Sequence, residues 1–163
     1  MIIFEQADLS NTAHGEAVLE LLSEYAEGLS GGSEPLPEKT RKNLISELIK
    51  RAHCHVVLGW DGETPVGVAI CFEGFSTFAC EPLLNIHDFA ISPDYQGQGL
   101  ANSMMEKVEQ IAVELGCCKI TLEVLEGNTI ARHVYEKYGF QGYELDPVMG
   151  KALFYEKKIT PSE

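Results

Sequence analysis

The feature that most constrains the fold is a glycine-containing loop between a β-rich run and a long amphipathic helix. The loop Ser92-Pro93-Asp94-Tyr95-Gln96-Gly97-Gln98-Gly99 follows strand-forming residues 83–91 and precedes Leu100. Glycine lets the backbone approach a ligand closely, and the first turn of a helix presents unpaired N–H groups with a partial positive charge. The loop is therefore a candidate phosphate cradle. The structural alternative is a helix start that needs tight packing.

Two common nucleotide-binding motifs are missing from the sequence. It contains neither G-x-x-x-x-G-K-[ST] nor G-x-G-x-x-G. The loop is therefore neither a nucleoside-triphosphatase loop nor a dinucleotide fingerprint.

The strand before the loop carries an irregular pattern. Ile86, Phe89 and Ile91 are spaced three and then two residues apart, so strict alternation would place them on different faces of a sheet. A β-bulge near His87 and Asp88 would reconcile them and expose backbone groups to a ligand.

The order of elements predicts the fold class. The chain has 163 residues and 45% hydrophobic residues, which suits one domain, 1–163. The pattern β-α-α-β-β-β-α-β-α-β-β predicts an α/β fold with a mixed central sheet of about seven strands flanked by about four helices. The expected strands are 1–8, 55–60, 65–72, 83–91, 119–125, 140–145 and 152–159, and the expected helices are 17–25, 44–49, 100–115 and 128–137.

Charge and hydropathy exclude several partners. The formal net charge is −13, which disfavours nucleic acid and anionic lipid surfaces and permits a cationic substrate. No apolar run is long enough to span a bilayer. The first residues lack a basic region typical of a signal peptide, so a soluble cytoplasmic protein is expected.

The cysteines and histidines do not predict a metal centre. The five cysteines form no C-x-x-C pair, and Cys54, Cys71, Cys117 and Cys118 lie in apolar or strand-like contexts, so they are expected to be buried free thiols. The vicinal pair Cys117–Cys118 leaves redox sensitivity open. His53-x-His55 has no third ligand at useful spacing, so no metal is predicted.

A second informative segment is the helix expected at 128–137. Asn128, Ala131 and Tyr135 are spaced by three and four residues and share one face, with a small residue between two polar ones. Taken alone, this stripe is better explained by a helix cap at Asn128 and ordinary packing of Tyr135.

The two segments together resemble the GCN5-related N-acetyltransferase (GNAT) family. Gln96-Gly97-Gln98-Gly99-Leu100-Ala101 is similar to the family's Q/R-x-x-G-x-G/A motif. Asn128 to Phe140 is similar to its N-x-x-A-x-x-x-Y-x-x-x-G-F motif. The resemblance implies an acetyl-CoA-dependent N-acetyltransferase without a metal, acting by direct attack of a primary amine.

The resemblance also implies roles for individual residues. Tyr135 would protonate the departing thiolate, since a phenol with a pKa of about 10 is protonated at neutral pH. A backbone N–H of the bulged strand would stabilise the oxyanion. The residues implied to contact the coenzyme are Phe89, Ala90, Ile91, Gln96, Gly97, Gln98, Gly99, Leu100, Ala101, Asn128, Ala131 and Tyr135.

The proton acceptor and the acceptor amine stay open in the sequence. Asp88 is the first choice for the base, with Glu123, His87 and an ordered water as alternatives, and Asp88 also suits binding of the substrate ammonium. Residues 75–78 together with Asp88 resemble the diamine and polyamine branch of the family. The segments 31–37 and 75–82 are expected to border the acceptor site.

Alternatives to a diamine, a polyamine or another small cationic amine are an amino acid, an antibiotic amine or a protein amine. A non-catalytic acyl-CoA-binding regulatory domain and a longer acyl donor are further alternatives. Many members of the family are homodimers, and the sequence leaves the oligomeric state open.

Overall fold

The structure, a computed structural model, describes residues 1–29 and 31–159. The chain divides into two units, Met1–Leu125 and the segment from Glu126 onward. The single domain expected for 1–163 stays a prediction. The two units are built differently, as their strands and helices show.

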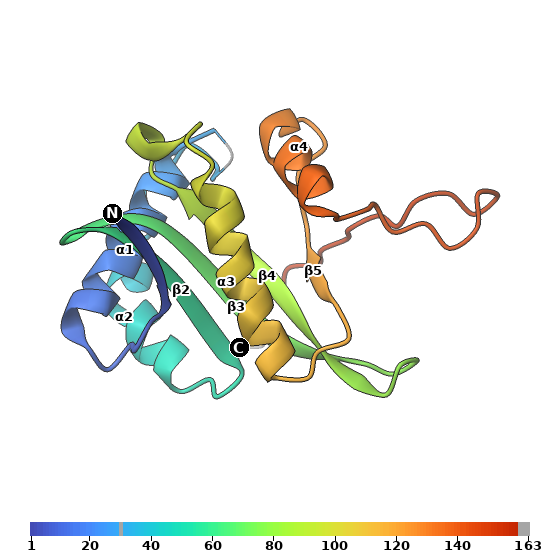
Figure 1. Cartoon of the computed structure of the whole chain (residues 1–163), viewed down its shortest axis with the longest axis horizontal. Helices are drawn as coiled ribbons and strands as arrows, with labels where there is room; N and C mark the ends of the chain where they lie inside the picture. The colour runs from blue at the N-terminus through green and yellow to red at the C-terminus, as the bar shows by residue number, and fades with distance from the viewer. Residues whose placement is uncertain (30, 160–163) are drawn as a thin grey trace. The chain divides into compact units, whose positions relative to one another are not determined.

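The first unit contains a mixed sheet of five strands in the order β1-β2-β3-β4-β5 (Figure 1). Neighbouring strands from β1 to β4 are antiparallel, and β5 is parallel to β4. The strands are β1 (Ile2–Gln6), β2 (Cys54–Asp61), β3 (Thr64–Ser76), β4 (Glu81–Ile91) and β5 (Ile120–Leu122).

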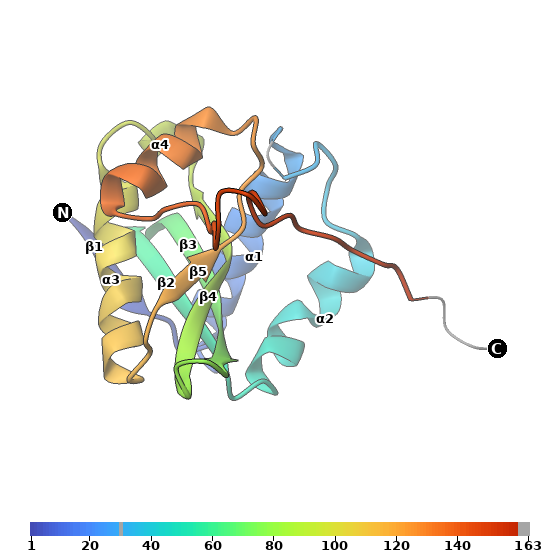
Figure 2. The ribbon, with the colours of Figure 1, turned by 90° about the vertical axis from the view of Figure 1, so that its right-hand side faces the viewer.

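Three helices of the first unit cover the two faces of this sheet (Figures 1 and 2). Helices α1 (Thr12–Glu27) and α2 (Glu38–Ile49) lie on one face, and α3 (Leu100–Glu114) lies on the other. A short 3-10 helix, η1 (Pro93–Tyr95), connects β4 to α3. Asn11 caps α1, because its side chain accepts a hydrogen bond from the Ala13 N–H.

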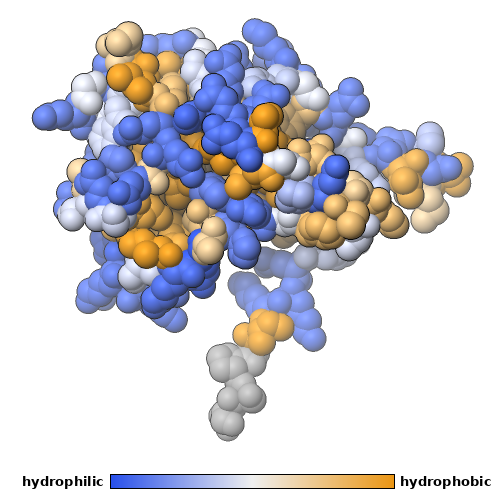
Figure 3. Space-filling view, turned by 60° about the horizontal axis from the view of Figure 1, so that its bottom comes forward, coloured by the Kyte–Doolittle hydropathy of each residue, from blue (hydrophilic) through white to orange (hydrophobic). Residues whose placement is uncertain are grey.

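The apolar stripes of the helices supply the core. On the α1 and α2 face, fully buried side chains include Val18, Leu21 and Val68. On the α3 face, Met104, Met105 and Val108 are fully buried. Burial of apolar surface stabilises a fold by about 25 cal/mol per Å². These side chains therefore supply much of the free energy that holds the helices against the sheet. The face drawn in Figure 3 is mostly hydrophilic, with hydrophobic groups scattered across it.

The expected bulge in β4 is confirmed. Ile70 of β3 pairs with Asp88, whereas the next residue, Cys71, pairs with Ile86, so His87 is the extra residue. Directly paired residues share a face of the sheet. The bulge therefore puts Ile86, Phe89 and Ile91 on the α3 face and turns Asp88 to the α1 and α2 face.

The prediction of about seven strands is wrong, because the described residues form a sheet of five. The expected strand at 119–125 shortens to β5 (Ile120–Leu122), and the expected strands at 140–145 and 152–159 do not form. Only an isolated bridge joins Glu144 to Lys151. A strand forms only where a neighbouring strand accepts its ladder hydrogen bonds, and this segment has one such contact.

The second unit contains one helix, α4 (Thr129–Tyr138), among its described residues. The Asn128 side chain caps it by accepting from the Ala131 N–H at 3.1 Å. Gly139 ends it with φ of 112°, in the left-handed region that favours glycine, as expected. After the helix, the Asp146 side chain and carbonyl accept hydrogen bonds from the N–H groups of Val148 and Met149, which forms a turn.

The thiols are less buried than the sequence predicts. Cys71 is buried, Cys54 and Cys117 are half-buried, and Cys118 is exposed. Strand-like composition alone did not reveal that Cys117 and Cys118 lie between α3 and β5, outside both elements. No described helix combines the length and apolar character that crossing a membrane requires.

Candidate functional site

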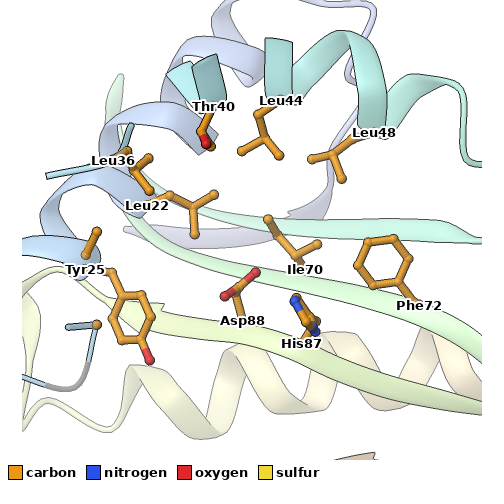
Figure 4. Close-up of a pocket in the computed structure, with 12 residues that line it drawn as sticks. Leu22, Tyr25, Leu36, Thr40, Leu44, Leu48, Ile70, Phe72, His87 and Asp88 are labelled. Carbon is orange, nitrogen blue, oxygen red and sulfur yellow. The ribbon is translucent and has the colours of Figure 1, made fainter. Parts of the chain in front are cut away.

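A cavity of about 320 Å³ lies on the α1 and α2 face of the first unit (Figure 4). Two adjacent residues of the bulge, His87 and Asp88, contribute to its wall. Without the bulge, Asp88 would share the α3 face with Ile86 and could not reach this cavity. The lining residues are Leu22, Tyr25, Ala26, Gly31, Leu36, Thr40, Leu44, Leu48, Ile70, Phe72, His87 and Asp88.

Asp88 is a half-buried carboxyl that points into this cavity (Figure 4). Burial raises its pKa above the ordinary value of 3.8, and the nearby His87 partly offsets the rise. Tyr25 faces it from α1, and burial together with the charge of Asp88 raises the pKa of the Tyr25 phenol. A carboxylate held in such surroundings binds an ammonium group or accepts a proton from it.

His87 lies at the rim of the cavity, because its side chain is exposed although it contributes to the wall. Its ring meets the Phe72 ring edge-on, with centroids 5.7 Å apart. This contact fixes the imidazole beside Asp88 on the outer side of the bulge.

The opposite wall comes from α1, α2 and the connection between them. Leucines from both helices lie across the cavity from Asp88 and His87 (Figure 4). Gly31 is required where this connection returns to α1, because a Cβ there would lie 2.0 Å from the Tyr25 carbonyl oxygen. Gly31 and Leu36, from the segment 31–37 that was expected to border the acceptor site, line this cavity. None of the described residues 75–82 lines the cavity, since they form the far end of the β3–β4 hairpin.

The loop after β4 has the geometry of an anion cradle. Gly97 and Gly99 have φ of 75° and 80°, and a Cβ on either would meet no heavy atom within 4 Å. The Gln96 side chain donates to the Ile91 carbonyl at 2.9 Å, which ties the loop to the end of β4. Gln98 donates from its side chain to the Asp94 carbonyl at 3.3 Å.

The amides at the start of α3 point out of the helix. Gly99 is its N-cap residue, and the Asn102 N–H is the first that bonds back, to the Gly99 carbonyl at 3.1 Å. The amides of Gly99, Leu100 and Ala101 belong to the first turn, where no intrahelical carbonyl can accept from them, and the Gln98 amide lies just before it. Positive φ at the two glycines and open space beside them let a phosphate approach these amides.

The pairing between β4 and β5 ends at the bulge. Only Leu84, Asn85 and Ile86 pair with β5, although β4 continues to Ile91. The edge of β4 that carries Phe89, Ala90 and Ile91 is therefore not covered by β5. The two strands therefore diverge beyond the bulge.

Glu123 lies apart from Asp88. It is exposed, and its two carboxylate oxygens each lie 3.5 Å from the Asn85 amide nitrogen. The same nitrogen donates to the Thr121 hydroxyl at 3.0 Å. Glu123 is not among the residues that line the cavity, so the structure brings Asp88 and His87 together there without it.

The remaining predicted residues lie on α4 in the second unit. Ala131 and Tyr135 belong to the helix, and Asn128 is its cap. The Phe140 ring contacts the rings of Tyr135 and Tyr138, with centroid distances of 6.0 Å and 6.3 Å, respectively. Asn128 therefore has a structural role as the cap of α4, which accounts for this residue even if it binds no ligand.

Of the pair His53-x-His55, His55 lies on β2 and makes contacts of its own. His55 Nε2 lies 2.6 Å from a Glu73 carboxylate oxygen, and the Gln6 amide lies 3.2 Å from His55 Nδ1. Among the described residues, no group of three or more His, Cys, Asp or Glu side chains is placed to hold a metal.

Sequence reasoning missed the cavity wall. Leu22 and Tyr25 fit the apolar stripe of the first helix, and Thr40 lies one turn before Leu44 on the second. One signal was available, because Tyr25 places a polar hydroxyl at a stripe position otherwise occupied by Ala, Val and Leu. The rest follows only from how two helices pack over the sheet.

Comparison with known proteins identifies the family. Residues 15–140 match the model of the acetyltransferase (GNAT) family. A thialysine N-epsilon-acetyltransferase from Bos taurus is 30% identical over 76% of this chain and 76% of its own length. The family model covers more than half of the chain, and the chain belongs to the acetyltransferase (GNAT) family.

Solved structures agree on the fold. A probable acetyltransferase superposes with a TM-score of 0.75 at 21% identity, covering 99% of both chains. An aminoglycoside N-acetyltransferase in complex with CoA superposes with a TM-score of 0.75 at 18% identity, covering 98% of this chain and 96% of its own. The prediction of an N-acetyltransferase of this family is thereby confirmed, and the acceptor is not identified by these relatives.

Proposed function

We propose that the chain transfers the acetyl group of acetyl-CoA to the primary amine of a small molecule bound at Asp88. The observation that carries the proposal is the bulge at His87, which turns one carboxyl into the cavity on the strand that also leads into the glycine cradle. Binding of the coenzyme and of the amine would thus meet on one strand, β4.

The cradle suits the pyrophosphate of coenzyme A. The amides of Gln98, Gly99, Leu100 and Ala101 would donate to phosphate oxygens, and the glycines leave room for them. The uncovered edge of β4 from Phe89 to Ile91 would pair with the pantetheine arm. When bound, acetyl-CoA supplies the thioester that the amine attacks.

The chain's own groups would then move the protons. Asp88 would take the ammonium in its charged form and accept a proton from it, so that a neutral amine is available for attack. The raised pKa makes this carboxylate a better proton acceptor than an exposed one. A backbone N–H of β4 beyond the bulge would donate to the developing oxyanion.

Tyr135 is proposed as the acid that protonates the departing thiolate. It follows Ala131 by one turn on α4, and its ring is oriented by Phe140. Asn128 and Ala131, on the same face, are proposed to contact the coenzyme.

The acceptors proposed from the sequence are a diamine, a polyamine or another small cationic amine. The names of relatives add thialysine and aminoglycosides as chemistries to test. The formal net charge of −13 attracts all of these cations, so it does not identify the acceptor.

The test is consumption of the acetyl-CoA thioester with a panel of amines. The panel holds spermidine, putrescine, lysine, thialysine, an aminoglycoside and a basic peptide. Loss of the thioester should be followed by its absorbance, because the exposed Cys80 and Cys118 would react with thiol reagents. Turnover with a small amine supports the proposal. Calorimetric binding of acetyl-CoA without turnover of any amine would instead indicate an acyl-CoA-binding domain.

A further inference from the structure

The cavity at Asp88 has an unequal distribution of polar groups. Its sheet side carries His87 and Asp88, whereas its helix side carries the leucines of α1 and α2 (Figure 4). Besides these two residues, only Tyr25 and Thr40 among the described lining residues bring a polar side-chain atom. A ligand that fills this cavity must therefore be polar at one end and apolar along the rest.

The charges of the lining narrow the ligand further. Asp88 is the one carboxyl among the described lining residues, and none of them is Lys or Arg. One ammonium group is matched by Asp88, but a second ammonium in the cavity would be buried without a partner. An α-carboxylate would be repelled by Asp88 and could pair only with His87, which is exposed at the rim.

Hydroxyl-rich amines fit the lining poorly as well. A sugar hydroxyl loses its hydrogen bonds to water when it is buried, and leucine side chains cannot replace them. The leucine wall, with Ile70 and Phe72 beside it, instead gains free energy from each methylene that it covers.

We propose that the preferred acceptor is a primary monoamine with an unbranched or aromatic apolar body, bound with its amine at Asp88 and its body against the leucine wall. This inference rests on the proposed function, because it assigns the cavity to the acceptor. The preferred acceptor would then carry one positive charge, unlike the diamine or polyamine expected from the sequence.

The experiment measures kcat/KM for acetylation of a series of n-alkylamines, from ethylamine to hexylamine, at one pH. Each added methylene should raise kcat/KM about fourfold, the factor that corresponds to burying one methylene. Hexylamine should exceed 1,5-diaminopentane, which has the same length but ends in a second ammonium, by at least about tenfold.

A variant should reverse this preference. Thr40→Asp places a second carboxylate on the α2 side of the cavity, so the ratio of hexylamine to 1,5-diaminopentane should fall about tenfold or more. Asn43→Asp is the matched control, because it adds the same charge to an exposed position of α2 that does not line the cavity. It should leave the ratio within about twofold of the unmodified chain.

The outcomes separate this inference from the proposed function. Turnover that is flat with chain length, or faster with 1,5-diaminopentane, lysine or an aminoglycoside, overturns the inference and leaves acetyl transfer standing. An equal effect of Thr40→Asp and Asn43→Asp also overturns it. If no amine is acetylated, calorimetry with the same n-alkylamines decides: binding that strengthens from ethylamine to hexylamine supports the apolar amine site, and absence of binding removes it.

Discussion

The two units of the chain are held by different interactions. In Met1–Leu125, helices and strands share a buried core, and all of the described buried hydrophobic residues lie there. In the segment from Glu126 onward, α4 has no buried residue and is held by its caps, Asn128 and Gly139, and by the ring of Phe140. The proposed proton acceptor belongs to the first unit and the proposed acid to the second.

This difference explains why the bulged strand β4 can hold a carboxyl that is partly buried away from water. A half-buried, ionisable Asp88 is costly for folding, and only a well-packed core can carry such a cost. The core side chains on both sides of β3 and β4 supply that support. A helix stabilised by local contacts can carry a phenol, which is neutral and costs less.

The largest effect is expected at Asp88. Asp88→Asn keeps the shape of the side chain but removes the charge that accepts the proton, so kcat/KM for the best amine should fall about 10²–10⁴-fold. Steady-state kinetics with saturating acetyl-CoA measure this. The matched control is Glu123→Gln, which removes an exposed carboxylate outside the cavity and should change kcat/KM by less than about threefold.

If Glu123→Gln is the more damaging change, the proton acceptor lies outside the cavity and the assignment to the bulge fails. If His87→Asn alone abolishes turnover, the imidazole at the rim is the base. Either result would contradict the assignment of the base to Asp88 in the packed core of the first unit and of the acid to Tyr135 on α4.

The second effect concerns the acid on α4. Tyr135→Phe removes only the hydroxyl, so kcat should fall about 10²–10⁴-fold while the Kd of acetyl-CoA, measured by calorimetry, stays nearly unchanged. Tyr138→Phe on the same helix is the control, since it removes a phenol hydroxyl from a ring that also contacts Phe140 but has no proposed catalytic role. Unchanged kcat in Tyr135→Phe would leave the second unit without a catalytic group.

A third, smaller effect concerns the cradle. Gly99→Val forces a β-branched residue to φ of 80° and puts its methyl groups where phosphate would approach, so the Kd of acetyl-CoA should rise about tenfold or more. Gly116→Val imposes similar strain at φ of 68° beyond the other end of α3. Both variants should lose stability, and only Gly99→Val should lose affinity. Equal affinities would remove the phosphate-binding role of the loop.

The sequence predicted those parts whose local signals agree with their surroundings. The β4 bulge follows from Ile86, Phe89 and Ile91, because three apolar side chains had to reach one buried face. Helix α4 follows from its caps, since Asn128 and Gly139 satisfy its ends without any distant residue. These elements needed only the neighbouring sequence.

The expected strands at 140–145 and 152–159 failed for the opposite reason. Alternating apolar residues such as Tyr143, Leu145 and Leu153 look like a half-buried strand, yet they are exposed in the structure. A strand depends on partners distant in sequence, which local pattern cannot supply. The cavity wall was missed on the same grounds, because Leu22 and Leu44 meet only when α1 and α2 pack over β3.

The smallest effect is on stability, and it tests whether the bulge holds Asp88 at a cost. The folded-state pKa of Asp88 is raised above 3.8, so folding favours its protonated form. That stabilising contribution is complete below about pH 3.8 and is lost as the pH rises through the raised pKa. Asp88→Asn should therefore raise the Tm by a few degrees at pH 7, and the gain should shrink as the pH falls toward 3.8.

Thermal unfolding of both forms across this pH range measures the gain, with Glu123→Gln as the exposed control that should not change the Tm. A lower Tm for Asp88→Asn at pH 7 would mean that the carboxylate is stabilised by a partner in the fold. Asp88 would then be a structural residue of the bulge, and the strand that joins cradle and cavity would have no base of its own. A higher Tm together with lost turnover would show that the first unit gives up stability for a carboxylate that acts on the amine.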